Sequence, residues 1–548
     1  MKELLYFDCN ARFGPRPKKH KRERWSKEHL LEDMELTGIA GALVVYEQSL
    51  LYDPMYSNLA LTEQIKNDRR ALYPCWVAKP PCCAEFPEPK DFVKMMKDYD
   101  VRAVRIAPGT FNVPVRERIW AGLRDALEEQ NTLIQITPAG FGDGPIAWRD
   151  IWAFLDIFRR NPVVLMDYSW ANWTDAIYLM DEHPNLHVEF ASCQGNRQIE
   201  YFAQRYGAGR CLFGTNLPYK SAGAARAFFD WTFLGDDQAE LVAGKNLVRL
   251  LGGQGPTTIP GKGRWSDGLT EAVRARQSLS CLVLDAHCHM LHDGGNTAGE
   301  RGLIQLRGDA QGIDEIARKV GIARTAAMSW TATLNMDVDL GNRIVGEAVR
   351  RFPDRYVGVC SVNPEIQSAE EIRQTIETYH EKLGFPGLEP FVLRQIIGFD
   401  DEGYAPWFEY ANQHGLYILV DWLGAGNAEA IVKKYPNVSI LAAHAGRSFP
   451  HADAVMQYMQ KYPNIYAEVD YTSAPNGLLE YYAERVGADR VLFGTDAPMR
   501  DQRPQAGWVV FSRLSEREKR LVLGENFNRI LKKAWGGRRG MHFESWPS

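Results

Sequence analysis

The chain has 548 residues, of which 45% are hydrophobic and 24% are charged, and its formal net charge is −5. These proportions are typical of a globular protein with more than one domain, and the acidic balance argues against nucleic acid as a partner. No apolar run approaches the ~18 residues of a membrane span, and nine cysteines without a C-x-x-C pair, after a start that lacks a signal-peptide pattern, predict a cytoplasmic protein.

The first predicted element is the strand in LLYFDCNARFG (residues 4–14), and a similar segment returns later as LVLDAHCHM (282–290). Both are apolar runs that reach an aspartate, Asp8 and Asp285, but only the second continues into two histidines. Other segments are repeated as well: RCLFGTNLP (210–218) is matched by RVLFGTDAP (490–498), and GKNLVRLL (244–251) by GENFNRIL (524–531). The chain therefore holds two copies of one plan, each about 250–270 residues long, which is the size of a barrel domain.

Strand-like and helix-like segments alternate along the second copy. After the strand CLVLDAH come the helix GIDEIARKVG (312–321), the strand RTAAMSW (324–330), the helix SAEEIRQTIETYHEKLG (368–384) and the strands LYILVDW (416–422), VSILAAHAG (438–446) and NIYAEVDY (464–471). Strands separated by amphipathic helices imply βαβ units and a parallel sheet. About eight such units in each copy predict an α/β protein made of two tandem (β/α)₈ TIM-type barrels.

These patterns also predict where the domains begin and end. We expect a barrel at 1–251, a linker rich in Gly, Pro and Thr at 252–278, a second barrel at 279–533 and an irregular tail at 534–548.

Polar residues follow the apolar runs of the second copy, where the carboxyl ends of barrel strands carry the active site. They are His287, His289, Glu389, Asp421, His444 and Asp496. Because side chains alternate along a strand, His287 and His289 point the same way and can take two adjacent positions around a metal ion. Asp496, after the last strand, can complete the site and handle a proton. Each residue alone could have a purely structural role, such as a hydrogen-bonded core histidine or a helix cap. Their occurrence together at successive strand ends favours a metal site.

The segments DAHCHM, HAGR, FGTDAP and GENFNRIL resemble the signature segments of the amidohydrolase superfamily, in its amidohydrolase-related branch. The resemblance covers residues 280–533 and, more weakly, 4–251. It implies that His287 and His289 bind the metal, that Asp496 binds it or moves the proton, and that His444 polarises the substrate or helps to hold the metal. The branch contains hydrolases and carboxylate decarboxylases, so it predicts an enzyme without naming a substrate.

The sequence departs from that family pattern at two positions. Asp421 stands where the branch usually has a histidine ligand after the fifth strand, and Glu389 stands where other members have a lysine or a neutral residue. We expect one divalent ion held by His287, His289, Glu389 and Asp496. Zn²⁺ is the first candidate, harder carboxylate ligands make Mn²⁺ or Fe²⁺ competitors, and a second ion bridged by Glu389 is left open.

The first copy lacks these groups. Our alignment sets Asn10 against His287, Arg105 against Glu389, Thr137 against Asp421, Asp167 against His444 and Asn216 against Asp496. No histidine remains at these positions, and Arg105 would repel a cation. The sequence therefore predicts a first barrel that keeps its packing but has lost its metal chemistry.

The function favoured by the sequence is a metal-dependent hydrolase that cleaves an ester, lactone or amide bond of a small substrate with a metal-activated water. Arg447, Arg394 and Asp421 are the expected substrate-binding residues. The two arginines are expected to bind a carboxylate group of the substrate. A non-oxidative decarboxylase with the same site is the first alternative, and a non-catalytic binding or scaffold protein is the second. A homo-oligomer is compatible with the sequence but is not required by it.

Overall fold

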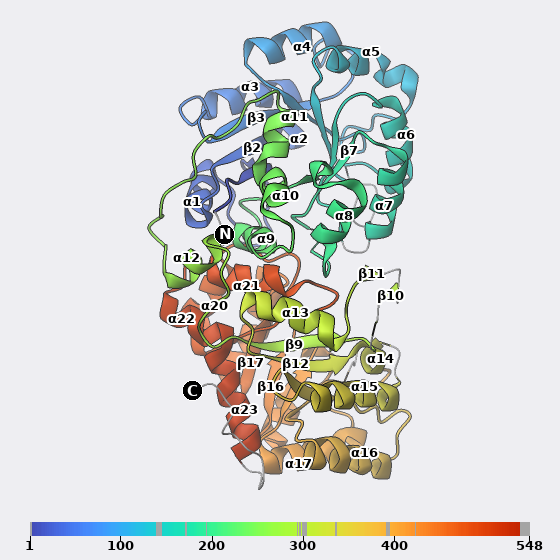
Figure 1. Cartoon of the computed structure of the whole chain (residues 1–548), viewed down its shortest axis with the longest axis vertical. Coiled ribbons are helices and arrows are strands. Elements are labelled where there is room, and N and C mark those ends of the chain that lie inside the picture. Colours follow the sequence, from blue (N-terminus) through green and yellow to red (C-terminus); the bar gives the residue numbers. More distant parts are fainter. Residues whose placement is uncertain are drawn as a thin grey trace. The chain divides into compact units, whose positions relative to one another are not determined.

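The structure is a computed structural model that describes residues 3–138, 145–169, 172–192, 194–292, 294, 297–298, 304–334, 337–390, 395–421 and 423–536. The chain divides into two compact units (Figure 1). The first is Met1–Ser266 with Arg274–Arg276, and the second is Asp267–Val273 with Gln277–Ser548. Each unit is described by itself below.

The first unit is a parallel sheet of eight strands, ordered β1 to β8 as in the chain, which confirms the predicted barrel topology. Its strands are β1 Phe7–Phe13, β2 Gly41–Tyr46, β3 Leu72–Ala78, β4 Ala103–Ile106, β5 Leu133–Ile136, β6 Val163–Leu165, β7 Leu186–Glu189 and β8 Cys211–Leu212. Its helices are α1 Lys27–Thr37, α2 Gln48–Leu51, α3 Pro54–Gln64, α4 Pro89–Asp98, α5 Glu117–Glu128, α6 Trp148–Ile157, α7 Trp173–Glu182, α8 Gln198–Tyr206, α9 Ala222–Asp230, α10 Asp236–Glu240 and α11 Asn246–Leu250. The last strand returns to the first, because the backbone NH of Cys9 donates to Phe213 O (2.9 Å) and that of Arg12 to Leu217 O (2.9 Å).

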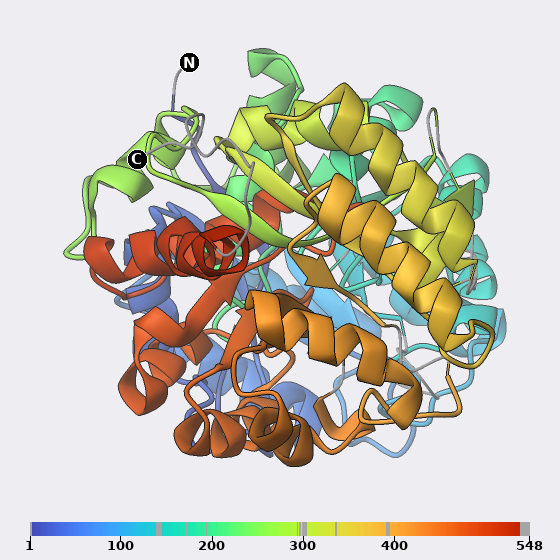
Figure 2. The same ribbon diagram turned by 90° about the horizontal axis from the view of Figure 1, so that it is seen from below.

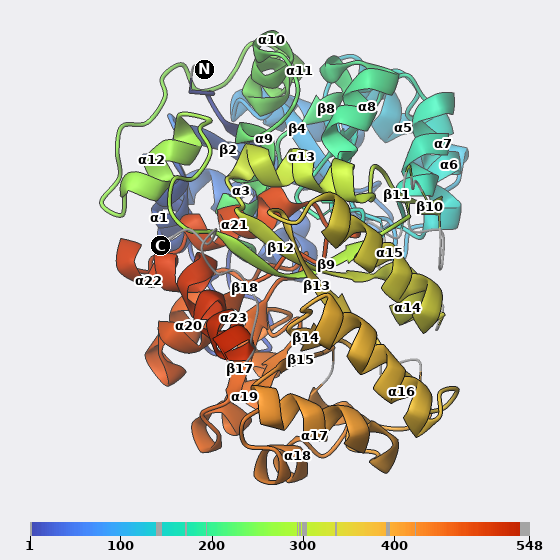
Figure 3. The same ribbon diagram turned by 60° about the horizontal axis from the view of Figure 1, so that its bottom comes forward.

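The second unit repeats this plan with a sheet of eight parallel strands (Figure 3). The strands are β9 Leu284–Met290, β12 Arg324–Ser329, β13 Tyr356–Cys360, β14 Gly387–Leu388, β15 Tyr417–Val420, β16 Ser439–Ala442, β17 Ile465–Val469 and β18 Val491–Phe493. The helices are α13 Ala310–Val320, α14 Trp330–Leu334, α15 Val338–Arg351, α16 Ala369–Thr375, α17 Ala405–His414, α18 Ala428–Lys434, α19 Phe449–Lys461, α20 Leu478–Val486, α21 Gln502–Val510, α22 Glu516–Arg520 and α23 Asn526–Gly536. Figure 2 shows helices of this unit packed around the outside of its strands. A short antiparallel pair, β10 Thr297–Ala298 and β11 Ile304–Gln305, lies outside the barrel sheet.

Local sequence signals explain where the helices begin. Ser368 caps α16 in a capping box with Glu371, and Asp309 accepts a hydrogen bond from Gly312 N at the start of α13. The predicted helix at 368–384 is α16 followed by a π-helical stretch, Ile376–Lys382, so the expected long helix is a composite.

Small and branched apolar side chains fill the interior of the second barrel. They include Leu284, Ala286, Ala326, Met328, Val357, Val359, Leu419, Leu441, Ala443 and Leu492, all buried. This layered core is what a closed parallel barrel requires. Because apolar side chains fill the interior, the polar residues at the carboxyl ends of the strands lie at the barrel mouth.

The segments between and after the barrels contain helix that the sequence did not predict. The stretch 252–278, expected to be a linker, contains α12 (Gly268–Arg274), and α23 runs to Gly536. Trp535 donates from Nε1 to Gly384 O (2.8 Å), which anchors the end of α23. The exact domain boundaries stay a prediction. Within the described residues no helix combines the length and the apolarity that crossing a membrane requires.

Candidate functional site

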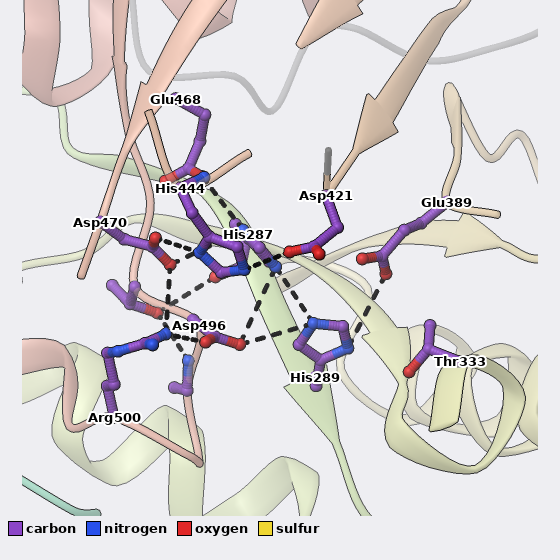
Figure 4. A network of polar contacts seen from close by, with 12 residues as sticks. His287, His289, Thr333, Glu389, Asp421, His444, Glu468, Asp470, Asp496 and Arg500 are labelled. Atoms are coloured by element: carbon purple, nitrogen blue, oxygen red, sulfur yellow. Dashed lines mark hydrogen bonds and ion pairs between the residues drawn. The ribbon is translucent and has the colours of Figure 1, made fainter. Parts of the chain in front are cut away.

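Two histidines of β9 share the mouth of the second barrel with one aspartate (Figure 4). His287 and His289 are both buried, and their Nε2 atoms lie 3.0 Å apart. Asp496, which follows β18, places Oδ1 3.9 Å from Nε2 of His287 and 3.5 Å from Nε2 of His289. Two imidazole nitrogens and one carboxylate oxygen therefore face a common point, as expected from their alternation along the strand.

A buried carboxylate oxygen at this point lacks a hydrogen-bond partner, as expected of a ligand to a cation. Oδ1 of Asp496 is buried and has no hydrogen-bond partner in the described structure, and such burial is costly unless a ligand compensates it. His287, His289 and Asp496 form one group that could hold a metal ion, because one ligand atom from each lies within 4.8 Å of the others. Two imidazoles and a carboxylate are donors that Zn²⁺, Mn²⁺ and Fe²⁺ all accept.

Carboxylates stand behind both rings. Nδ1 of His287 lies 3.1 Å from Oε2 of Glu468, and Nδ1 of His289 lies 3.7 Å from Oε2 of Glu389. A carboxylate hydrogen-bonded to the outer nitrogen of a histidine fixes the ring and leaves the other nitrogen for a metal, and Glu468 does this for His287. Glu389 lies beside His289 without a hydrogen bond to it. Glu389 was predicted as a ligand, but it approaches the outer nitrogen of His289 and belongs to neither group of ligand atoms around a common point.

Burial and neighbouring charge set the protonation of this region. Burial raises the pKa of Glu389 to about 8, which favours its neutral form. Burial also lowers the pKa of His289 well below its usual value. Burial acts in the same direction on His287, but the hydrogen bond and charge of Glu468 outweigh it and leave the pKa of His287 raised.

His444, which follows β16, is held between two carboxylates. Its Nε2 lies 2.8 Å from Oδ1 of Asp421, and its Nδ1 lies 2.5 Å from Oδ1 of Asp470. Burial opposes protonation, but the charges of Asp470 and Asp421 dominate and raise the pKa of His444 to about 10. In the metal-free protein this pKa favours the imidazolium form of His444 at neutral pH. Asp421, which stands where the family has a histidine ligand, serves as its partner.

A second group able to hold a metal ion shares His287 with the first. It consists of His287, His444, Glu468 and Asp470, and all four are buried. Because the two groups share His287, they do not decide between one ion and two at the mouth of the second barrel.

Of the two arginines predicted to bind substrate, one lies at the site in the described structure. Arg447 places Nη2 3.4 Å from Oδ1 of Asp421 and stacks on Tyr471, so it borders the site. Arg394 lies outside the described residues. Trp330 packs its ring edge-on against His289, with centroids 4.8 Å apart, and walls the site on that side.

Three residues at the site were not predicted from the sequence. Glu468 and Asp470 lie at the end of β17, and Arg500 pairs with Asp496 and donates from Nε to Oγ1 of Thr472 (3.0 Å). The spacing of Glu468 and Asp470 repeats that of His287 and His289, but alternation alone does not tell whether such a pair faces the barrel mouth.

The first barrel preserves the frame of this site without its metal-binding atoms. Asp167 and His444 both adopt left-handed backbone, at φ 51° and 53°, and so do Asn216 and Asp496, at φ 62° and 54°. The strand registers agree too, because Ala103 pairs with Leu133 in β4–β5 while Gly387 pairs with Tyr417 in β14–β15. That register places Arg105 at the position of Glu389, as predicted.

Arg12 stands two residues after Asn10, as His289 does after His287, and it brings its own positive charge to the first barrel. Its guanidinium donates to Oδ1 of Asn216 (2.8 and 3.1 Å) and pairs with Oδ2 of Asp167 (3.1 Å). Among the described residues, both groups that could hold a metal ion lie in the second barrel.

Comparison with known proteins agrees with this geometry. A family model described as amidohydrolase matches residues 59–253 and 284–533, one match in each barrel. The chain belongs to the amidohydrolase family. It is an enzyme of that family with two (β/α)₈ barrels in tandem.

One curated relative and two solved structures illustrate what this amidohydrolase is similar to. A gamma-resorcylate decarboxylase of Polaromonas sp. strain JS666 is 22% identical over 283 residues, which are 41% of this chain and 85% of that protein. The structure of 5-carboxyvanillate decarboxylase from Sphingomonas paucimobilis matches at 15% identity and a TM-score of 0.36, covering 46% of this chain and 99% of that one. The structure of a dihydroxybenzoic acid decarboxylase from Polaromonas sp. JS666, with bound manganese and 2-nitroresorcinol, matches at 16% identity and a TM-score of 0.36, covering 46% and 97%.

A matched pair of threonines offers a test of how the frame supports the site. Thr495 donates from Oγ1 to Oδ2 of Asp285 (2.7 Å), and Thr215 donates in the same way to Asp8 in the first barrel. Removing either hydroxyl leaves a buried carboxylate short of a donor, so Thr495→Ala and Thr215→Ala are each expected to lower the free energy of unfolding by about 1–3 kcal/mol. Only Thr495→Ala should also reduce bound metal, measured by mass spectrometry of dialysed protein. An equal loss of metal in Thr215→Ala would contradict this division.

Proposed function

We propose that this amidohydrolase is a metal-dependent, non-oxidative decarboxylase of a small carboxylic acid, acting in the second barrel. The observation that carries the proposal is the set of His287, His289 and Asp496 around one point, in a chain whose 22%-identical relative is a gamma-resorcylate decarboxylase. A hydroxybenzoate is the substrate class that this relative suggests. The edge of Trp330 beside His289 offers an aromatic wall for such a ring.

His287, His289 and Asp496 would hold the ion, with Glu468 orienting the ring of His287 through its hydrogen bond. A divalent ion in this position supplies positive charge that draws the substrate's oxygen atoms and stabilises negative charge developing on the substrate. Zn²⁺ and Mn²⁺ are the ions we propose to test first, because both accept this donor set.

A side chain of the protein can supply the proton that the reaction needs. When the bond between the ring carbon and the carboxylate breaks, its electron pair stays on the carbon, CO₂ leaves, and the carbon takes one proton. We assign that proton to His444, which Asp421 and Asp470 hold as an imidazolium in the barrel mouth. Asp496 stays paired with Arg500. Arg447 at the border of the site is suited to receive a substrate anion.

Hydrolysis, which the sequence favoured, is the second candidate. It would use the same groups, but a hydrolase needs a base that is free to accept a proton near neutral pH. Because its pKa is raised to about 10, His444 already carries a proton at neutral pH, so it is not free to act as that base but has a proton to give, which is why we place decarboxylation first.

The two reactions are separated by following the carboxyl carbon and the oxygen of water. Metal-replete full-length protein is incubated with 2,6-dihydroxybenzoate labelled with ¹³C at the carboxyl group, and separately with aryl esters in ¹⁸O-water. We expect release of ¹³CO₂ and no ¹⁸O in the ester samples beyond a control without enzyme. Ester cleavage with ¹⁸O in the product, and no ¹³CO₂ from a panel of hydroxybenzoates, would favour the hydrolase.

A further inference from the structure

Arg105 in the first barrel is a buried cation without a counter-charge. It lies on β4, is 3% exposed, and has no carboxylate oxygen within 4.0 Å among the described residues. The other buried arginines of the described chain behave differently. Each of the five pairs with a carboxylate: Arg226 with Asp230, Arg274 with Glu3, Arg276 with Asp236, Arg500 with Asp496 and Arg503 with Asp501. Arg105 is the exception, and a buried unpaired charge is expensive.

Neutral amides hold Arg105 in a defined orientation. Nε and Nη2 both donate to Oε1 of Gln135, at 3.0 and 2.8 Å, and Nη2 also donates to Oδ1 of Asn10 at 3.3 Å. Gln135 is itself fixed, because its Nε2 donates to Cys9 O (2.7 Å). One edge of the guanidinium is therefore occupied, while Nη1 has no hydrogen bond to a described residue.

The carboxylates around Arg105 either pair with Arg12 or are mainly neutral. Arg12 is paired already, with Asp167 at 3.1 Å and Glu47 at 3.6 Å. Burial raises the pKa of Glu189 to about 8, so this neighbour of Asn10 is mainly neutral at pH 7. Burial, and then the positive charge of Arg12, lower the pKa of Arg105, as expected of a cation that lacks its counter-ion.

We infer that the mouth of the first barrel is a binding site for a small carboxylate anion, with Arg105 as its anchor. Nη1 keeps N–H donors that no described residue accepts, and an anionic carboxylate oxygen is the acceptor that forms a charge-assisted hydrogen bond with such a donor. Asn10 of β1 contacts Arg105, and Arg12, two residues further along the same strand, has a side chain that is 19% exposed. The barrel that has lost its metal ligands thus keeps the usual ligand position of its fold but offers a fixed cation there.

The test uses the full-length chain, freed of metal with a chelator, and acetate as the probe. Binding is followed by saturation-transfer difference NMR on the acetate methyl protons. Because the charge-assisted hydrogen bond from Nη1 is lost, Arg105→Gln is expected to weaken acetate binding at least about tenfold, and Arg105→Lys, which keeps the charge without the guanidinium geometry, should fall between. Arg102→Gln is the matched control, because it makes the same change at an exposed arginine just before β4 and should leave binding unchanged.

Thermal melting guards against misfolding of the variants. Acetate at constant ionic strength should raise the melting temperature of the wild type and not that of Arg105→Gln, whose melting temperature without acetate should be no lower than that of the wild type. The inference is overturned if the wild type gives no saturable signal, or if Arg105→Gln binds acetate as the wild type does. Stronger displacement of acetate by phosphate than by benzoate would overturn the assignment to carboxylates. None of these outcomes depends on the second barrel being a decarboxylase.

Discussion

Asp496→Asn is expected to reduce kcat/KM by at least about 10³-fold, because about 4 kcal/mol of stabilisation of developing charge is lost with the metal. The substitution installs in the second barrel the residue that the first barrel has at Asn216. It removes the anionic charge of the oxygen Oδ1, which lacks a partner in the described structure, while it keeps the shape of the side chain. Bound metal after dialysis should fall well below that of the wild type. Steady-state kinetics and mass spectrometry on the same preparation give both quantities.

The control for this experiment is Asn216→Ala in the first barrel. It disturbs an equivalent left-handed corner, where Asn216 accepts from Arg12, but no group able to hold a metal. Metal content and kcat/KM should stay close to those of the wild type. If Asp496→Asn keeps its metal and its activity, Asp496 is not a ligand and the proposed centre is misassigned.

His444→Asn is expected to lower kcat by about 10²- to 10⁴-fold, the usual contribution of a positioned acid, with a smaller change in KM. Its raised pKa, about 10 in the metal-free protein, keeps the wild type protonated at neutral pH. Activity should therefore be present below that pKa and be lost as the pH rises through it. A bound cation disfavours imidazolium, so this alkaline limb should lie at or below pH 10.

Asp421→Asn separates this acid function from a structural one. Asp421 faces Nε2 of His444 at 2.8 Å, and its charge is one of the causes of the raised pKa. Without it, the alkaline limb of the kcat profile should move to lower pH, while activity on the acidic side of the new limb is largely kept. An unchanged limb in Asp421→Asn, or a His444→Asn variant with full kcat, would remove His444 from the proposed chemistry.

The sequence predicted the site residues best where their positions are set by the geometry of a single strand or by the internal repeat. The run LVLDAHCHM predicted both the strand β9 and two histidines on one side of it, because alternation along a strand is enforced by its geometry. The repeat also predicted that Asp167 corresponds to His444 and Asn216 to Asp496, and the shared left-handed backbone agrees with both pairs. Periodicity and repetition are local properties, so they can be read without coordinates.

The sequence was less informative about which atom of a side chain faces which neighbour. Glu389 was expected at the metal, but the structure sets it against Nδ1 of His289, on the far side of the ring from Asp496. Glu468 and Asp470 were overlooked because NIYAEVDY satisfies an ordinary strand pattern, in which two acidic residues are as compatible with a rim as with an interior. Both questions depend on how eight strands close, which no single segment encodes.

The most direct test of the central claim is the metal content of a double variant that carries the residues of the first barrel. His287→Asn with His289→Arg reproduces the pattern of Asn10 and Arg12 in the second barrel. After incubation with Zn²⁺ or Mn²⁺ and dialysis, the wild type should retain at least one ion per chain, and the double variant, if it melts cooperatively, should retain none. Equal metal in the two proteins, or none in the wild type, would contradict a cation site at the mouth of the second barrel.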